Sequence, residues 1–138
     1  MEKGKTLTRG QRNCNPLNIR KSATRFSGEV DGTDKEFKTF RTMAWGYRAA
    51  ITILNTYYKR YMLDTIGKMI SRWAPSNEND TNNYIATVCR RTGIPRGQKI
   101  HFYKSEIVAI VSAMSYVENG VNAKQSEVEE GWLMFVGG

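Results

Sequence analysis

Glu118 is the residue of this sequence best suited to acid catalysis, because it falls on the apolar face of a helix predicted near the C-terminus. It follows Ile107 by eleven positions, Val111 by seven and Met114 by four, and at about 3.6 residues per turn these spacings share one face. Burial and the negative end of the helix dipole both raise the pKa of a carboxyl group there. A carboxyl group protonated near neutral pH can donate to a glycosidic oxygen. Alternatively, the last turn frays and Glu118 turns into solvent or pairs with an arginine or lysine.

A second carboxylate would decide how such a bond is broken. The candidates lie in or beside a small sheet predicted near the N-terminus: Glu29, Asp31 and Asp34. A group of this kind could act with Glu118 or position a water molecule. Aspartates in turns also serve the turn itself through local hydrogen bonds, so both interpretations stand.

Metal and triad chemistry find little support in the sequence. Cys14 and Cys89 stand 75 positions apart without a CxxC spacing, and His101 is the single histidine. Zinc sites need several such ligands. A nucleophilic triad would need His101 as its base, and its polar surroundings favour a surface histidine in a connector. We therefore expect two free thiols, no metal and no cofactor.

Length and composition favour one soluble domain over residues 1–138. The chain has 40% hydrophobic and 25% charged residues, which excludes fibrous and wholly disordered classes. No apolar run is long enough for a membrane helix, so we expect no stable membrane insertion. The first residues lack the apolar core of a signal peptide.

The net charge of +8 predicts a polyanionic partner such as nucleic acid, acidic lipid or the bacterial wall. A basic cluster follows the third predicted helix: Arg90, Arg91, Arg96 and Lys99. Without a recognisable helix-turn-helix signature such a cluster is more often a solvated face. Nucleic-acid binding is therefore the less favoured alternative, and we expect no nucleic-acid partner.

The elements that must position these residues form a mainly α, α+β fold. Residues 1–18 carry no period and predict an arm or loop, and residues 19–40 hold short β-prone runs typical of a small irregular antiparallel sheet. Residues 43–136 show the helical period and predict five helices. The predicted N-terminal caps are Thr42, Asp64 or Thr65, Asp80 or Thr81, Ser105, and Ser126 in a capping box with Glu129. The predicted ends lie near Tyr61 and at Pro75, Gly93 and Gly120.

Several segments, in order, resemble a family of small phage and prophage proteins. They are RGQRNCNPLNIR (9–20), FSG (26–28), FKTFRTMAWGYRAA (37–50), TIGKMISRWAPSNENDTNNYIATV (65–88) and AMSYVENG (113–120). Members of that family typically show RGxRNxNPGNIR, WxG, RWAPxxxNxTxxYI and a helix ending in ENG. The resemblance covers nearly the whole chain. Leu17 replaces the usual glycine, which could alter a backbone turn, and Phe26 stands where tryptophan is common.

The family resembles lysozyme-type peptidoglycan cleavers, which implies a lysozyme-like fold with an unusual order of segments. In lytic transglycosylases the helix that carries the catalytic glutamate precedes the segment similar to NPLNIR, whereas here the glutamate helix comes last. We therefore hypothesise a circularly permuted lysozyme-like site. In it, Glu118 packs beside residues 15–20 and Tyr84.

The resemblance also implies roles for individual residues. Glu118 would act as general acid and then as base, and Tyr84 would present a hydroxyl in the cleft, unless it is simply a core aromatic. The residues implied to contact sugar or wall peptide are Asn15, Asn18, Arg20 and Asn119. The asparagines around Pro16 could equally be turn residues. Trp73 fits core packing first and sugar stacking second.

The expected activity is cleavage of the β-1,4 bond between N-acetylmuramic acid and N-acetylglucosamine in peptidoglycan glycan strands. A second carboxylate would favour attack by water, whereas without one the muramic 6-hydroxyl could attack and leave an anhydro product. We expect a monomer made in the bacterial cytoplasm that reaches the wall by virion delivery, lysis or secretion. The alternative is a non-catalytic virion or secretion-apparatus component that keeps the fold and binds glycan or a partner protein.

Overall fold

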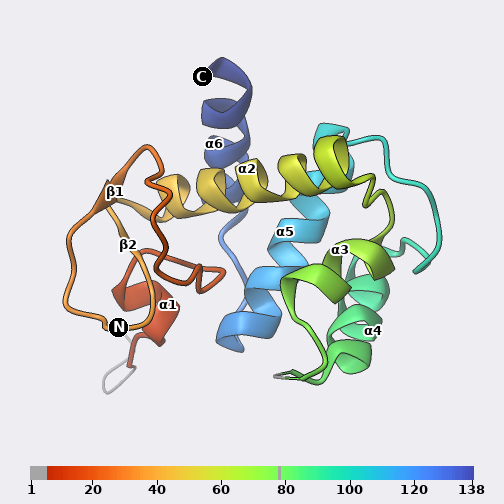
Figure 1. Cartoon of the computed structure of the whole chain (residues 1–138), viewed down its shortest axis with the longest axis horizontal. Helices are drawn as coiled ribbons and strands as arrows, with labels where there is room; N and C mark the ends of the chain where they lie inside the picture. The colour runs from red at the N-terminus through yellow and green to blue at the C-terminus, as the bar shows by residue number, and fades with distance from the viewer. Residues whose placement is uncertain (1–5, 78) are drawn as a thin grey trace.

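The computed structural model describes residues 6–77 and 79–138, which form a mainly helical α+β fold (Figure 1). In this part of the chain the elements are α1 (Arg9–Arg12), β1 (Glu29–Val30), β2 (Thr39–Phe40), α2 (Met43–Tyr61), α3 (Ile66–Trp73), α4 (Thr81–Thr92), α5 (Lys104–Asn119) and α6 (Gln125–Gly137). The predicted fold class is confirmed. The expected arm of residues 1–18 lies partly outside the described residues, and its described part contains α1. A capping box of Thr8 and Gln11 starts that helix.

The small sheet is shorter than the β-prone runs predicted. β1 and β2 are antiparallel, with Glu29 opposite Phe40 and Val30 opposite Thr39, and Arg20 and Phe37 form an isolated bridge. Side chains satisfy much of the nearby backbone in place of a longer ladder. The clearest case is Lys38, which is 1% exposed and donates from Nζ to the carbonyl oxygen of Thr24 at 2.7 Å and to the Glu29 carboxylate at 3.1 Å. A buried ammonium group needs such partners.

Most helix boundaries follow the predicted capping residues. Thr42, Thr65 and Asp80 each accept a backbone N–H of the first turn of their helix. Gly93 and Gly120 end α4 and α5 in the left-handed conformation, with φ of 75° and 71°, as glycine does most readily.

Two predicted caps are wrong. α5 begins at Lys104, before Ser105, because the Glu106 carboxylate accepts the backbone N–H groups of His101 and Tyr103 at 2.9 Å. α6 begins at Gln125, before Ser126. The Gln125 side chain donates to Glu129 at 2.9 Å, so the glutamate is held there and not at a Ser126 cap.

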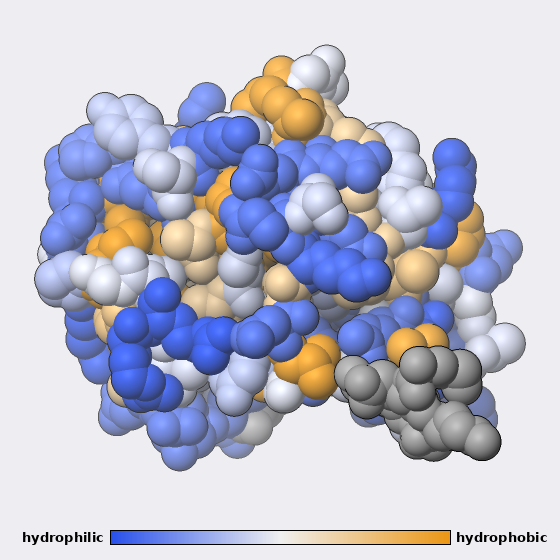
Figure 2. All heavy atoms as spheres, turned by 180° about the vertical axis from the view of Figure 1, so that it is seen from behind, coloured by the Kyte–Doolittle hydropathy of each residue, from blue (hydrophilic) through white to orange (hydrophobic). Residues whose placement is uncertain are grey.

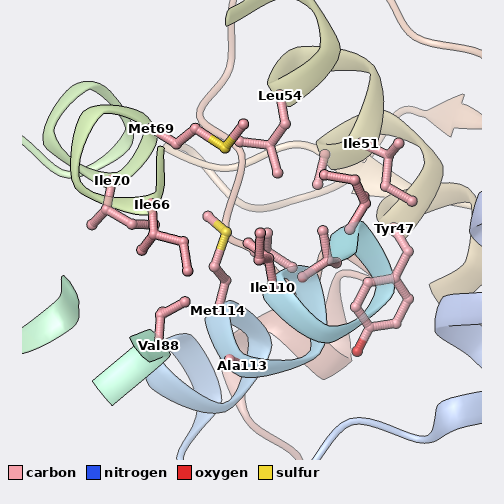
Figure 3. Close-up of a cluster of buried hydrophobic side chains, with 14 of the residues drawn as sticks. Tyr47, Ile51, Leu54, Ile66, Met69, Ile70, Val88, Ile110, Ala113 and Met114 are labelled. Carbon is pink, nitrogen blue, oxygen red and sulfur yellow. The ribbon is translucent and has the colours of Figure 1, made fainter. Parts of the chain in front are cut away.

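The hydrophobic core lies where α2, α3, α4 and α5 meet (Figure 3). One face of α2 is buried, at Tyr47, Ala50, Ile51 and Leu54, whereas Tyr61, at the end of that helix, is 45% exposed. Met62 follows in the left-handed region and ends α2 at the surface. Inside the core the Tyr47 hydroxyl and Ser115 Oγ lie 2.9 Å apart, so this buried phenol has a hydrogen-bond partner.

The helix α6 packs across α2, and its far end projects from the body of the molecule (Figure 1). Leu133 and Val136 near that end are 60% and 57% exposed, and Figure 2 shows an apolar tip on an otherwise mostly hydrophilic face. In the described part of the chain no helix has the length and apolar character that crossing a bilayer requires.

The contact between α2 and α6 depends on a glycine, so Gly131→Ala is expected to destabilise the fold. A Cβ at Gly131 would lie 2.8 Å from Tyr47 Cβ and 3.0 Å from the Ala44 carbonyl oxygen, atoms that cannot move independently of α2. We expect a loss of about 1–3 kcal/mol in the free energy of unfolding, measured by urea denaturation. Gly137→Ala is the matched control, because a Cβ there meets no atom within 4 Å. An equal loss in both variants would contradict the steric account.

Candidate active site

Glu118 lies in the last turn of α5 and is held from two sides. Asn18 Nδ2 donates to Oε1 at 2.9 Å, and the Tyr84 hydroxyl donates to Oε2 at 3.0 Å. One donor comes from the loop after α1 and the other from α4. The expected contact of Glu118 with residues 15–20 and Tyr84 is therefore confirmed. The alternative in which the helix end turns Glu118 into solvent is wrong.

Burial raises the pKa of Glu118 above its ordinary value. Hydrogen bonds from Asn18, Tyr84 and Trp73, together with the charge of Arg20, act in the opposite direction because they favour the carboxylate. Burial is the larger influence. The pKa of Tyr84 is raised well above its usual value, first by burial and then by the negative charge of Glu118, so the phenol remains a neutral donor. Glu118 therefore binds its proton more readily than an ordinary glutamate, and the neighbouring Tyr84 hydroxyl stays protonated.

The cleft in front of Glu118 has a volume of about 350 Å³. Of the residues expected to bind substrate, Asn18, Arg20 and Trp73 line it. The remaining lining residues are Leu17, Ile19, Phe37, Ile53, Tyr57, Ala74, Pro75 and Asn79. A larger hollow of about 580 Å³ lies elsewhere on α5, beside Arg91 and Lys104, and none of the expected site residues lines it.

Aromatic rings form two walls of the cleft. The rings of Trp73 and Tyr57 meet edge to face with centroids 6.4 Å apart, and the Arg20 guanidinium lies over the Phe37 ring at 5.3 Å. Both arrangements are favourable for aromatic surfaces. The sequence did not indicate Tyr57 as a cleft residue, because its position on α2 lies beside the buried face of that helix. Phe37 lies in the FKTF segment, which is part of the resemblance to the phage family, and this signal could have indicated it as a cleft residue.

Three residues expected to bind the substrate do not line the cleft. Tyr84 is buried, does not line the cleft and donates to Glu118 Oε2. Asn15 is also buried, and its amide bonds with the backbone of Ile19 and with the Lys38 carbonyl oxygen at 2.8–2.9 Å. Its role is to fold the loop that carries Asn18. The third residue is Asn119.

Asn119 joins the end of α5 to the N-terminal segment. Its Nδ2 donates to the carbonyl oxygens of Pro16 at 2.7 Å and Ser115 at 2.9 Å, and its Oδ1 accepts from Thr8 Oγ1 at 2.7 Å. These bonds occupy both ends of the amide. Asn119 is therefore a structural clamp next to the candidate acid.

The loop that presents Asn18 has two residues with positive φ, Cys14 at 49° and Asn18 at 52°. Asparagine tolerates this region better than most residues. Leu17, which stands where the resembling family has glycine, is not among the positive-φ residues, so leucine causes no strain there. Gly10 lies against this loop. A Cβ on it would be 2.5 Å from Asn119 Oδ1 and 2.9 Å from the Asn15 carbonyl oxygen.

The candidate second carboxylates do not reach the cleft. Glu29 is paired with buried Lys38, and Asp31 is fully exposed, 3.6 Å from Arg25. Among the described residues that line the cleft, Glu118 is therefore the single carboxylate.

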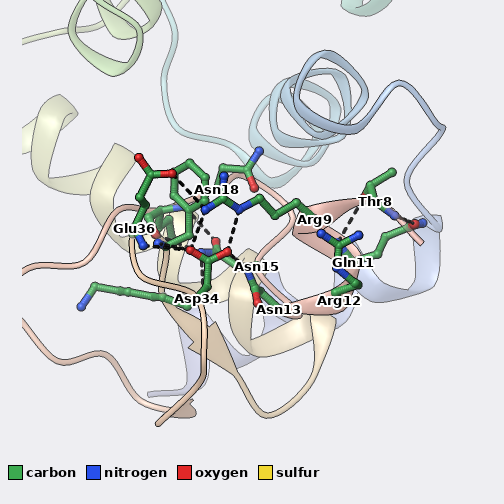
Figure 4. Close-up of polar contacts among 12 residues, drawn as sticks. Thr8, Arg9, Gln11, Arg12, Asn13, Asn15, Asn18, Asp34 and Glu36 are labelled. Carbon is green, nitrogen blue, oxygen red and sulfur yellow. Dashed lines mark hydrogen bonds and ion pairs between the residues drawn. The ribbon is translucent and has the colours of Figure 1, made fainter. Parts of the chain in front are cut away.

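Asp34 instead holds α1 against the sheet loops (Figure 4). It accepts from Arg9 Nε at 2.6 Å, from Arg9 Nη2 at 2.8 Å and from Asn13 Nδ2 at 3.0 Å. These bonds hold the pKa of Asp34 well below its ordinary range, with Arg9 as the largest cause. Such a group stays ionised and serves the fold.

The two cysteines and the histidine do not line this cleft. Cys14 and Cys89 are unpaired, as expected, and burial raises the pKa of both thiols. His101 is exposed in the connector before α5. Among residues 6–77 and 79–138 no three histidine, cysteine, aspartate or glutamate side chains gather closely enough to hold a metal ion.

Comparison with known proteins relates most of the chain to a phage protein. The chain is 43% identical over 129 residues to Protein P5 of Pseudoalteromonas phage PM2, and the match spans 90% of this chain and 79% of that protein. No family model matches the chain.

Asn119→Ala is expected to lower the free energy of unfolding by about 2 kcal/mol, because it leaves the buried carbonyl oxygen of Pro16 without its donor. Chemical denaturation would measure the loss. Asn83→Ala on the exposed side of α4 is the control and should change stability by less than about 0.5 kcal/mol. Unchanged stability in Asn119→Ala would rule out the clamp.

Asn18→Ala and Tyr84→Phe are each expected to raise the pKa of Glu118 further, because each removes a hydrogen bond that favours the carboxylate. A pH titration of the side-chain carboxyl signals by carbon-13 NMR would measure the shift. Asn79→Ala removes a cleft residue whose amide donates to the Pro75 carbonyl oxygen, and it should leave the pKa of Glu118 unchanged. A fall of the pKa in either test variant would contradict this electrostatic balance.

Proposed function

The chain belongs to the family of Protein P5 of Pseudoalteromonas phage PM2, and we propose that it is a phage-type glycosidase that cleaves peptidoglycan, with Glu118 as its general acid and base. The observation that carries this proposal is a partly buried carboxyl group of raised pKa at the floor of a cleft, held by Asn18 and Tyr84. Acid catalysis of glycoside cleavage needs such a group.

The first step follows from the protonation of Glu118. The carboxyl O–H donates its proton to the glycosidic oxygen, the bond from the anomeric carbon of N-acetylmuramic acid breaks, and the leaving sugar departs with a new hydroxyl. The hydrogen bonds from Asn18 and Tyr84 then stabilise the carboxylate that remains. These same bonds keep the carboxylate oriented toward the cleft for the next step.

The second step uses the carboxylate as a base. Since no other carboxylate lines the described part of the cleft, we favour attack by the muramic 6-hydroxyl on the positively charged anomeric carbon. Glu118 takes the proton of that hydroxyl and is restored to its acid form. The product is a 1,6-anhydro sugar, and water in place of the 6-hydroxyl would give a reducing end.

The walls of the cleft suit a sugar polymer. Trp73, Tyr57 and Phe37 offer ring surfaces, and Arg20 and Asn79 offer hydrogen-bond donors for hydroxyl and N-acetyl groups. The contact between residues 15–20 and Glu118 is also what a circularly permuted lysozyme-like arrangement requires. In this proposal the protein meets the wall when a virion delivers it or when the cell is lysed.

Glu118→Gln is expected to lower release of soluble muropeptides from purified peptidoglycan by about 10²–10⁴-fold, because glutamine cannot donate the proton. Mass analysis of the products would measure release and identify the ends, with anhydro ends expected for the wild type. Asp31→Asn, on the exposed sheet loop, is the matched control and should retain full activity. Release by Glu118→Gln at the wild-type rate, or no release by the wild type, would leave a structural or glycan-binding role.

A further inference from the structure

A basic hollow of about 680 Å³ lies on the outer side of α3 and is not part of the cleft. Its cations are Lys68, Arg72 and Arg96, and all three are exposed. Lys68 and Arg72 are four residues apart on α3 and therefore share a face. Arg96 reaches the same hollow from the connector between α4 and α5.

A glycine brings these two segments together. The Gly67 N–H donates to the Arg96 carbonyl oxygen at 3.1 Å, and a Cβ on Gly67 would lie 3.0 Å from Arg96 Cγ. The connector can therefore lie against α3 at this point. The hollow is therefore formed by the packing of the connector against α3 and not by surface side chains alone.

The two arginines of the hollow have no carboxylate partner within ion-pair distance among the described residues. The third cation, Lys68, lies 3.4 Å from Asp64, a carboxylate that it shares with Lys99 at 3.9 Å. The Arg72 guanidinium lies instead over the rings of Tyr61 at 4.1 Å and Tyr57 at 5.3 Å. A guanidinium stacked in this way is oriented and still has N–H groups for a carboxylate.

Tyr57 connects the basic hollow with the cleft. Its ring lines the cleft and meets Trp73, and Arg72 of the hollow lies over the same ring. A ligand bound by Arg72 is thus one aromatic side chain away from a sugar in the cleft. The group that binds to Arg72 is therefore best explained as another part of the substrate that occupies the cleft.

We propose that the basic hollow binds carboxylates of the peptide attached to the glycan strand, an inference that rests on the proposed function. Muramic acid carries this peptide through an amide to the lactyl group that is ether-linked to its sugar ring, and the peptide bears several carboxylates. Lys68, Arg72 and Arg96 together provide enough positive charge, and arginine binds a carboxylate through two parallel hydrogen bonds. The enzyme therefore selects peptide-bearing strands over bare glycan.

The test compares cleavage of peptide-bearing strands with cleavage of the same strands after an amidase has removed their peptides. The wild type is expected to show a kcat/KM about tenfold higher on peptide-bearing strands, and the double variant Arg72→Gln/Arg96→Gln is expected to lose that ratio. The control, Arg41→Gln/Arg90→Gln, removes two exposed charges elsewhere and should keep it. Equal rates of the wild type on both substrates, or an equal loss in the control, would overturn the proposal.

Binding separates failure of this proposal from failure of the proposed function. The free stem tripeptide is titrated into the wild type and the double variant at fixed ionic strength, with inorganic phosphate as the competing probe. Binding that only the wild type shows, and that phosphate does not displace at equal concentration, supports the peptide site even if neither strand is cleaved. No binding, or displacement by phosphate, overturns it, and displacement would indicate a phosphate-bearing polymer.

Discussion

The hydrogen bond from Asn119 to the Pro16 carbonyl oxygen joins two segments 103 positions apart in the chain, and the geometry of the cleft depends on it. Through this bond the loop after α1 is fixed to the end of α5, so that Asn18 comes within reach of Glu118. The loop in turn is folded on the buried amide of Asn15. Hydrogen bonds from asparagine side chains thus hold this loop in place, as a longer sheet would do in a larger fold.

Placing Glu118 in the core stripe has an energetic cost for the fold. Because burial raises its pKa above the ordinary value, the native state holds this proton more tightly than the unfolded chain does. Stability from this group is present below the ordinary pKa of about 4.5 and is lost as pH rises through the raised value. The partners of the carboxylate reduce this loss without removing it. A carboxyl group kept against the preference of the fold is typical of a functional position.

The sequence predicted what depends on local order. The helical period located Glu118 on the apolar face of its helix, side-chain chemistry predicted the cap at Thr42, and the backbone freedom of glycine predicted the end at Gly120. It could not predict the role of Asn119, because the partners of that amide lie at the other end of the chain. The same limit explains why Asp34 was a candidate carboxylate: only the folded chain brings Arg9 onto it. Capping chemistry failed where a glutamate side chain from within the helix replaced the expected serine.

The separation between Asn18 and Glu118, 100 positions along the chain, also bears on the order of events during synthesis. The ribosome synthesises the loop that holds Asn18 long before the helix that carries Glu118. A partly synthesised chain therefore has no complete cleft. Contacts so distant in sequence form late in folding, since closing a long loop must precede them. The α2, α3 and α4 segments can collapse first. Joining the two distant ends is then the event that completes the cleft.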